Sequence, residues 1–149
     1  MKIYLDVCCL NRPFDDLSQD RVYLEAEAVL SIISHCESGE WVLLFSDAIE
    51  YEISKLPDTE KYEQVQTLCA VAKHKIELDG QSETRAKFFS ENGVKPLDSL
   101  HLALAEKGGA NVFLTTDDQL YKAAKKINLK VKIDNPVNWL MGVINNERK

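Results

Sequence analysis

Four acidic residues stand at positions where the elements of an α/β protein would bring their carboxylates together. Asp6 and Asp117 each follow a short apolar segment typical of a buried β-strand, and the other two acids lie on segments with helical periodicity. In open α/β sheets, ligands bind just beyond the carboxyl ends of the strands. The sequence therefore predicts an acidic site at that edge of the sheet, formed by Asp6, Glu52, Asp98 and Asp117.

Such a cluster needs a compensating positive charge. Two carboxylates about 4 Å apart repel each other by roughly 4 kcal/mol at an effective dielectric constant of about 20, so four of them cannot all stay ionised on their own. Asp98 lies within an otherwise apolar helical turn, where an unpaired acid is costly. With no cysteine or histidine ligand available, an all-oxygen set of donors indicates Mg²⁺ or Mn²⁺.

Two neighbouring acids compete for the same positions. At about 100° per residue, Glu52 lies about 65° from the centre of the apolar stripe of its helix, and Glu50 lies about 95° away on the other side. This geometry favours Glu52 only mildly. Asp118 is deeper in the next predicted helix than Asp117, where an acid at the surface complements the helix dipole. Glu50 and Asp118 therefore remain alternatives.

The elements that must position these acids follow from the alternation of apolar strands and amphipathic helices. We expect an α/β fold with a central parallel sheet of four or five strands, flanked by helices on both faces. Strands are predicted at 2–5, 41–45, 75–78, 111–114 and 130–133. Helices are predicted at 18–37, after the caps Ser46, Asp58, Ser82 and Thr116, and from Pro96 and Pro136 onward. The segment 7–16 is predicted to be a loop.

Composition limits the classes of protein that fit. The 149 residues suit a single domain over 1–149, and the net charge of −6 argues against a non-specific polyanion binder. A divalent ion would nevertheless make an acidic site locally positive. The four cysteines form no C-x-x-C pair, which favours free thiols in a reducing compartment. With no apolar run of the roughly 20 residues that a membrane helix needs and no signal segment, we expect a cytoplasmic protein.

The chain resembles the PIN domain family, the nuclease fold shared by VapC-type toxins of bacterial toxin–antitoxin pairs. The resemblance spans nearly the whole chain, and the order and spacing of its motifs are more specific than any one of them. These motifs are the strand-ending Asp6, Ser46 followed by Glu52, the segment Asp98-Ser99-Leu100-His101-Leu102-Ala103, and Thr115-Thr116-Asp117. Cys8 departs from the pattern, because the family usually has Ser, Thr or Asn two residues after the first Asp. A thiol is a weak hydrogen-bond partner, so either Asn11 takes over that contact or the activity is altered.

The resemblance implies a Mg²⁺- or Mn²⁺-dependent endoribonuclease that hydrolyses phosphodiester bonds, with the four acids as its metal ligands and catalytic groups. It also implies a toxin role, an RNA substrate, a small antitoxin partner and a homodimer. Further residues that would support the acids or contact the substrate are Asn11, Arg12, Thr115 and Thr116. For Lys122, Lys125 and Lys126 a solvated helix face is the better explanation, and for His101 a packed core histidine.

Several alternatives use similar residues. A housekeeping RNA-processing nuclease or a non-catalytic PIN-like protein-binding module would have the same fold. A haloacid-dehalogenase-like phosphatase would need a second Asp where Cys8 stands, and a receiver domain would need a late strand-end Lys that is absent from the pattern. The presence of all four acids favours an enzyme over a binding module, although Cys8 leaves that module open.

Overall fold

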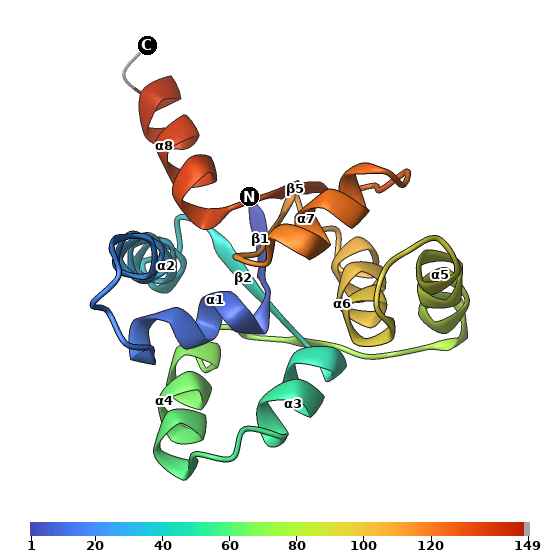
Figure 1. Ribbon diagram of the computed structural model, residues 1–149, viewed down its shortest axis with the longest axis horizontal. Helices are drawn as coiled ribbons and strands as arrows, with labels where there is room; N and C mark the ends of the chain where they lie inside the picture. Colours follow the sequence, from blue (N-terminus) through green and yellow to red (C-terminus); the bar gives the residue numbers. More distant parts are fainter. Residues whose placement is uncertain (148–149) are drawn as a thin grey trace.

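The computed structural model describes residues 1–147, which form an α/β fold around one five-stranded sheet. The strands are β1 (Lys2–Leu5), β2 (Val42–Ser46), β3 (Lys75–Ile76), β4 (Val112–Leu114) and β5 (Lys132–Asp134). All neighbouring strands are parallel, in the order β3-β2-β1-β4-β5, so β1 lies at the centre (Figure 1). The predicted fold class is confirmed.

Helices cover both faces of this sheet. They are α1 (Val7–Asn11), α2 (Asp20–Glu37), α3 (Asp47–Ser54), α4 (Thr59–Cys69), α5 (Gly80–Glu91), α6 (Pro96–Lys107), α7 (Asp118–Lys125) and α8 (Pro136–Glu147), with a 3₁₀ helix η1 (Arg12–Phe14) after α1. Figure 1 shows α2 beside α8 on one side of the strands and α6 beside α5 on the other. Among residues 1–147, no helix has both the length and the apolar character needed to cross a membrane.

The central strand forms the middle of the hydrophobic core. Ile3, Tyr4 and Leu5 are 0% exposed, and the ring of Phe113 on β4 stacks on Tyr4 with 5.1 Å between centroids. Each fully buried apolar side chain of this size contributes about 1.5–3 kcal/mol to stability. The ends of β1 and β4 therefore extend from a rigid centre. Asp6 follows β1 directly, and Asp117 follows β4 after two threonines.

The segment after β1 differs from its prediction as a loop. The carboxylate of Asp6 accepts a hydrogen bond from the backbone N of Val7 over 2.9 Å and caps α1. The helix then buries Val7, Cys9 and Leu10 in the core. A strong cap and three apolar residues suffice for a short helix here, because packing stabilises it more than intrinsic propensity does.

Two predicted helix starts are also wrong, for one shared reason. α5 begins at Gly80 because the carboxylate of Asp79 accepts from Ser82 N over 2.8 Å, and Oγ of Ser82 accepts from the backbone N of Asp79 over 3.4 Å. α7 begins at Asp118 because Asp117, rather than Thr116, accepts hydrogen bonds at the helix start. In both places a carboxylate next to a hydroxyl takes the capping position, since a charged acceptor binds backbone N–H groups more strongly.

Candidate active site

Asp6 lies at the carboxyl end of the central strand and is only 5% exposed. Its Oδ2 accepts hydrogen bonds from the Oγ1 of Thr115 over 2.8 Å and from the Sγ of Cys8 over 3.3 Å. Burial raises the pKa of Asp6, and the charge of His101 and the hydrogen bond from Thr115 oppose that rise only in part. A buried carboxylate of this kind favours a neighbouring positive charge.

Glu52 reaches the same region from α3. Ser46 caps this helix by accepting from Ile49 N over 3.2 Å. Ile53, the residue after Glu52, is buried, and this part of α3 packs near α6. There, Oε1 of Glu52 lies 2.8 Å from Nε2 of His101. Ligand atoms of Asp6, Glu52 and His101 all lie within 4.8 Å of one another, a spacing that could hold one metal ion.

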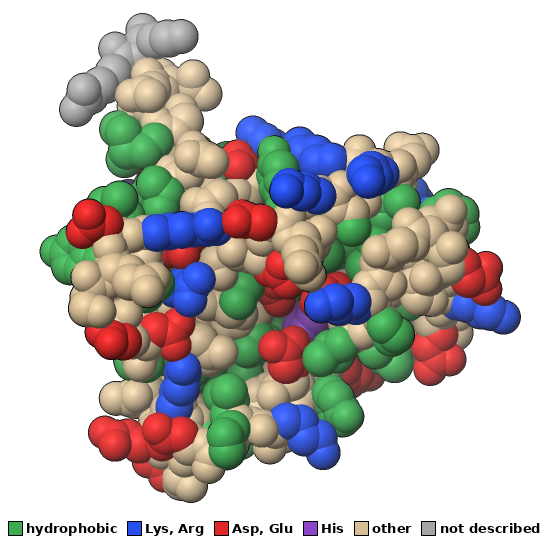
Figure 2. Space-filling view, in the orientation of Figure 1, with side chains coloured by type: hydrophobic (Ala, Val, Ile, Leu, Met, Phe, Trp, Pro, Cys, Tyr) green, Lys and Arg blue, Asp and Glu red, His purple; other side chains and the backbone are tan. Residues whose placement is uncertain are grey.

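Asp98 belongs to this group electrostatically. It lies half-buried in the first turn of α6. Burial, followed by the negative charge of Asp6, raises the pKa of Asp98 to about 6, with smaller contributions in the same direction from Asp117 and Glu52. The protein therefore brings the four predicted acids close enough for their charges to interact (Figure 2), and acidic side chains gather there around a histidine near the centre of the face.

Asp117 follows β4 and serves as the cap of α7. Its Oδ1 accepts hydrogen bonds from Gln119 N over 2.9 Å and from Leu120 N over 3.2 Å. Together with Asp98 and Lys95 it lines a small cavity of about 110 Å³ between the starts of α6 and α7.

The two alternative acids point elsewhere. Glu50 is 53% exposed and forms an ion pair with Lys75 over 3.2 Å. Asp118 is also exposed and pairs with Arg21 over 2.9 Å. Neither belongs to the group formed by Asp6, Glu52 and His101.

The supporting residues differ in where they lie. Thr115 and Cys8 contact Asp6 directly, and the backbone N of Thr116 donates to Cys8 Sγ over 3.4 Å. Asn11 forms no hydrogen bond with Asp6. Its Oδ1 is buried and has no hydrogen-bond partner among residues 1–147. The thiol of Cys8 therefore occupies the hydrogen-bonding position itself, with Thr115 as the stronger donor.

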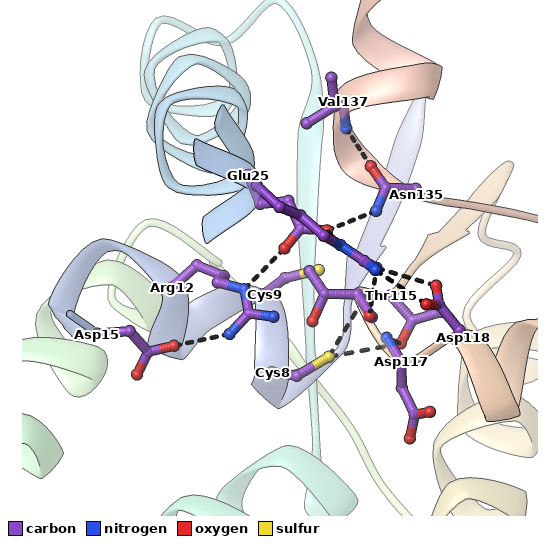
Figure 3. Close-up of polar contacts among 12 residues, drawn as sticks. Cys8, Cys9, Arg12, Asp15, Glu25, Thr115, Asp117, Asp118, Asn135 and Val137 are labelled. Carbon is purple, nitrogen blue, oxygen red and sulfur yellow. Dashed lines mark hydrogen bonds and ion pairs between the residues drawn. The ribbon is translucent and has the colours of Figure 1, made fainter. Parts of the chain in front are cut away.

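Arg12 lies in an ion-pair network beside the acids (Figure 3). Its Nε donates to Oε1 of Glu25 over 2.9 Å and its Nη1 to Oδ2 of Asp15 over 3.0 Å. Glu25 is 1% exposed and also accepts from Arg21 Nε over 3.1 Å and from Asn135 Nδ2 over 2.7 Å. The network joins η1, α2 and the start of α8. In it, the charge of Arg12 is balanced by acidic side chains of the protein itself.

The predicted role of His101 as a packed core histidine describes its burial but not its contact with the acids. It is 0% exposed, as a core histidine would be, yet it contacts Glu52. Burial would lower the pKa of His101, but the hydrogen bond to Glu52 and the charge of Asp6 raise it overall. The available signal was its spacing, because residues three apart on a helix share a face and His101 follows Asp98 by three.

Comparison with known proteins gives three similar structures. FitAcB from Neisseria gonorrhoeae matches with 15% identity and a TM-score of 0.60, covering 90% of this chain and 97% of that one. VapBC2 from Rickettsia felis, in a structure bound to a DNA fragment from their promoter, matches with 14% identity and a TM-score of 0.58. The match covers 91% of this chain and 98% of that one. PAE2754 from Pyrobaculum aerophilum matches with 18% identity and a TM-score of 0.55 over 98% and 99%. At these identities the similarity establishes the fold.

Sequence comparison identifies the family. Among curated proteins, none matches the chain. The family model described as the PIN domain matches residues 3–126. That span runs from the second residue of β1 through α7 and includes all four acids of the site. The chain belongs to the PIN domain family.

Proposed function

We propose that this protein is a divalent-metal-dependent ribonuclease that hydrolyses phosphodiester bonds, with Asp6, Glu52, Asp98 and Asp117 as its catalytic groups. The observation that carries the proposal is the convergence of acids from different elements: ligand atoms of Asp6 and Glu52 lie within 4.8 Å of each other. Asp98 and Asp117 lie near enough for their charges to interact, and burial and the other three acids raise the pKa of Asp98. Acids brought together in this way inside a protein are costly unless a cation compensates them. Membership of the PIN family supports the same reading.

The donor set fits a hard cation. Carboxylate oxygens suit Mg²⁺ or Mn²⁺, and the four acids would hold the ion, directly or through water. A divalent ion bound there supplies polarisation of a phosphate oxygen and activation of an attacking water. Thr115 and Cys8 donate hydrogen bonds to Asp6, and His101 contacts Glu52.

The substrate also needs a cation of the protein. Arg12 pairs with Asp15 and Glu25, and Arg21 pairs with Glu25 and Asp118. The charges of the two arginines are therefore largely balanced. Lys95 is exposed and lines the cavity of Asp98 and Asp117. Within residues 1–147 it forms no ion pair. We assign Lys95 the contact with an RNA phosphate next to the scissile bond.

The biological role that we propose is that of a toxin with a small antitoxin partner, acting on RNA in the cytoplasm as a homodimer. The similar structures of FitAcB and VapBC2 support the partner by analogy of fold. Four free cysteines suit a reducing compartment. We also treat 1–149 as a single PIN domain: β5 pairs with β4, and Trp139 of α8 contacts Trp41 with 5.1 Å between ring centroids.

One experiment tests the activity. Purified protein is incubated with a mixed RNA substrate and Mn²⁺ or Mg²⁺, with EDTA as the metal-free control. Cleavage that requires the metal and is absent from Asp98→Asn supports the proposal. A protein that binds no Mn²⁺ by calorimetry and cuts no RNA contradicts it and favours the protein-binding module.

A second experiment separates the toxin from a housekeeping nuclease. The chain is expressed from an inducible promoter, with and without the short reading frame next to its gene. Growth arrest that this neighbour relieves supports the toxin role. Metal-dependent cleavage without growth arrest, and without a short neighbouring frame, favours RNA processing.

A further inference from the structure

Four side chains form a continuous line of hydrogen bonds that ends at the acidic site. Oγ of Ser46 lies 2.6 Å from the hydroxyl of Tyr4, which lies 2.7 Å from Nδ1 of His101. Nε2 of His101 then lies 2.8 Å from Oε1 of Glu52. Ser46, Tyr4 and His101 are each 0% exposed, so no solvent molecule competes for these contacts.

The acceptor role of Glu52 fixes the role of the nitrogen that faces it. The carboxylate of Glu52 accepts hydrogen bonds only, so Nε2 of His101 must carry a hydrogen. In a neutral imidazole, Nδ1 is then an acceptor, and the hydroxyl of Tyr4 donates to it. In a protonated imidazole, Nδ1–H donates to the oxygen of Tyr4 instead. In both states each ring nitrogen is engaged in a hydrogen bond. Burial raises the pKa of Tyr4, so its hydroxyl remains protonated.

The far end of the line completes the arrangement with a neutral ring. The backbone N of Ile49 donates to Oγ of Ser46 over 3.2 Å, which leaves the Ser46 hydroxyl free to donate to Tyr4. The line therefore begins at the start of α3 and returns to Glu52 on the same helix. Tyr4 itself is held by β1 and by stacking on Phe113, so the imidazole has a rigid support.

We propose that His101 is a positioning residue, which holds Glu52 toward Asp6 through Nε2–H and contributes no nitrogen to the metal. Its ring lies within 4.8 Å of ligand atoms of Asp6 and Glu52, so ligation by His101 is the natural alternative. A ligating imidazole needs a free nitrogen lone pair, and the line of hydrogen bonds leaves none. The site consequently keeps an all-oxygen donor set, which suits Mg²⁺ and Mn²⁺, whereas an added imidazole would favour Zn²⁺.

This inference rests on the proposed nuclease function, and its test includes a measurement that does not depend on cleavage. Electron spin-echo spectroscopy of the Mn²⁺-loaded protein detects nitrogen bound to the ion. We expect no coupling from a directly coordinated ¹⁴N. A clear ¹⁴N coupling that disappears in His101→Gln would overturn the proposal.

Affinity and kinetics give the second reading. Partners that orient metal ligands typically affect activity or affinity by about 10–100-fold. We expect His101→Leu to lower kcat by about tenfold or more while its KM for RNA stays unchanged. His101→Gln, which can donate to Glu52 through its amide, should recover part of that loss. A fall in Mn²⁺ affinity as large as that of Asp6→Asn would identify His101 as a ligand and contradict the proposal.

Tyr4→Phe tests the line without altering the histidine. It removes the hydroxyl that occupies Nδ1, so the ratio of Zn²⁺ to Mn²⁺ affinity should rise at least several-fold. An unchanged ratio and unchanged kcat would overturn the proposed role of the line. His35→Gln is the matched control, since His35 also pairs with a glutamate, Glu40, but at an exposed position away from the site.

The outcomes separate the two proposals. If wild-type protein binds Mn²⁺ and cuts RNA but shows coordinated nitrogen, only the role of His101 is refuted. If it binds no Mn²⁺ and cuts no RNA, both proposals are refuted.

Discussion

The hydroxyl of Thr115 donates to Oδ2 of Asp6 over 2.8 Å and accepts from the backbone N of Asp117 over 3.1 Å. One side chain therefore connects the acid after β1 with the acid after β4. Thr115 is 2% exposed, so its hydrogen bonds are made away from solvent. The relative positions of the two carboxylates depend on this contact.

Removing that hydroxyl should weaken the site more than removing the thiol beside it. We expect Thr115→Val to lower Mn²⁺ affinity by about 10–100-fold. Cys8→Ala should have a smaller effect, because Cys8 Sγ lies 3.3 Å from Asp6 Oδ2 and a thiol is a weak donor. Calorimetric titration of both variants with Mn²⁺ measures the difference. Equal losses would contradict this ranking, and Cys8→Ser should bind at least as well as wild type.

Asp98→Asn should stabilise the metal-free protein and abolish its response to metal. The substitution removes a charge that interacts unfavourably with Asp6 and Asp117. Cleavage should fall by about a hundredfold or more if Asp98 helps to hold the ion. Thermal unfolding with and without Mn²⁺ checks both effects together.

Asp118→Asn is the matched control for this variant, because Asp118 is exposed and pairs with Arg21. It should retain cleavage and the increase in Tm with Mn²⁺. If Asp118→Asn loses activity and Asp98→Asn keeps it, our choice of acids is wrong.

Metal binding should depend on pH near the raised pKa of Asp98, about 6. Below that pH the carboxyl is protonated and the ion must displace the proton, so Mn²⁺ affinity should fall by about tenfold per pH unit for one proton. Titrations between pH 5 and about pH 7.5 measure this slope. A flat profile across that window would contradict the assignment.

Stability of the metal-free protein should change in the opposite sense. Because folding raises the pKa of Asp98 and of Asp6, the folded state holds protons that the unfolded state releases. The free energy of unfolding should therefore decrease as pH rises from about 4.5 to about 6.5. Asp79 and Asp118, whose pKa values are lowered, stay ionised in this window and do not reverse the trend. Saturating Mn²⁺ should restore the lost stability.

Glu25 should be more important for stability than its distance from the acids suggests. Its buried carboxylate accepts from Arg12 and Asn135 (Figure 3) and also from Arg21. Arg21 also donates to the carbonyl of Thr116 over 3.1 Å. Glu25→Ala leaves two guanidinium groups without their shared partner and should cost about 3 kcal/mol. Urea unfolding measures this, and Glu27→Ala, exposed on the same helix, should be neutral.

Replacing Lys95 should weaken RNA binding without lowering the affinity for Mn²⁺. Lys95→Ala removes a phosphate contact, so RNA binding should weaken and its dependence on salt concentration should decrease by about one unit of slope. Mn²⁺ affinity should not fall, since the lost charge lies beside Asp98 and Asp117. Lys87→Ala, also exposed but on α5, is the control. An unchanged salt slope would refute the role of Lys95.

The sequence by itself determined the fold class and the approximate place of the acids. Strong apolar segments such as 2–5 and 112–114 are buried on both faces in parallel sheets, and their order along the chain limits the topology. An acid directly after such a strand must lie at the carboxyl edge. This is why Asp6 and Asp117 were predictable from local pattern.

Only the tertiary structure decided how the acids are held. Which acid is buried beside which donor depends on contacts between residues far apart in the chain, such as Thr115 with Asp6 and His101 with Glu52. The sequence pattern of α6 predicts burial for His101, but it cannot distinguish a histidine packed among apolar groups from one that contacts a carboxylate. Arg12 likewise pairs with Glu25, thirteen residues later, and no local pattern predicts that contact. Local periodicity specifies which face of an element is buried, whereas the partners on that face are set by the packing of the whole domain.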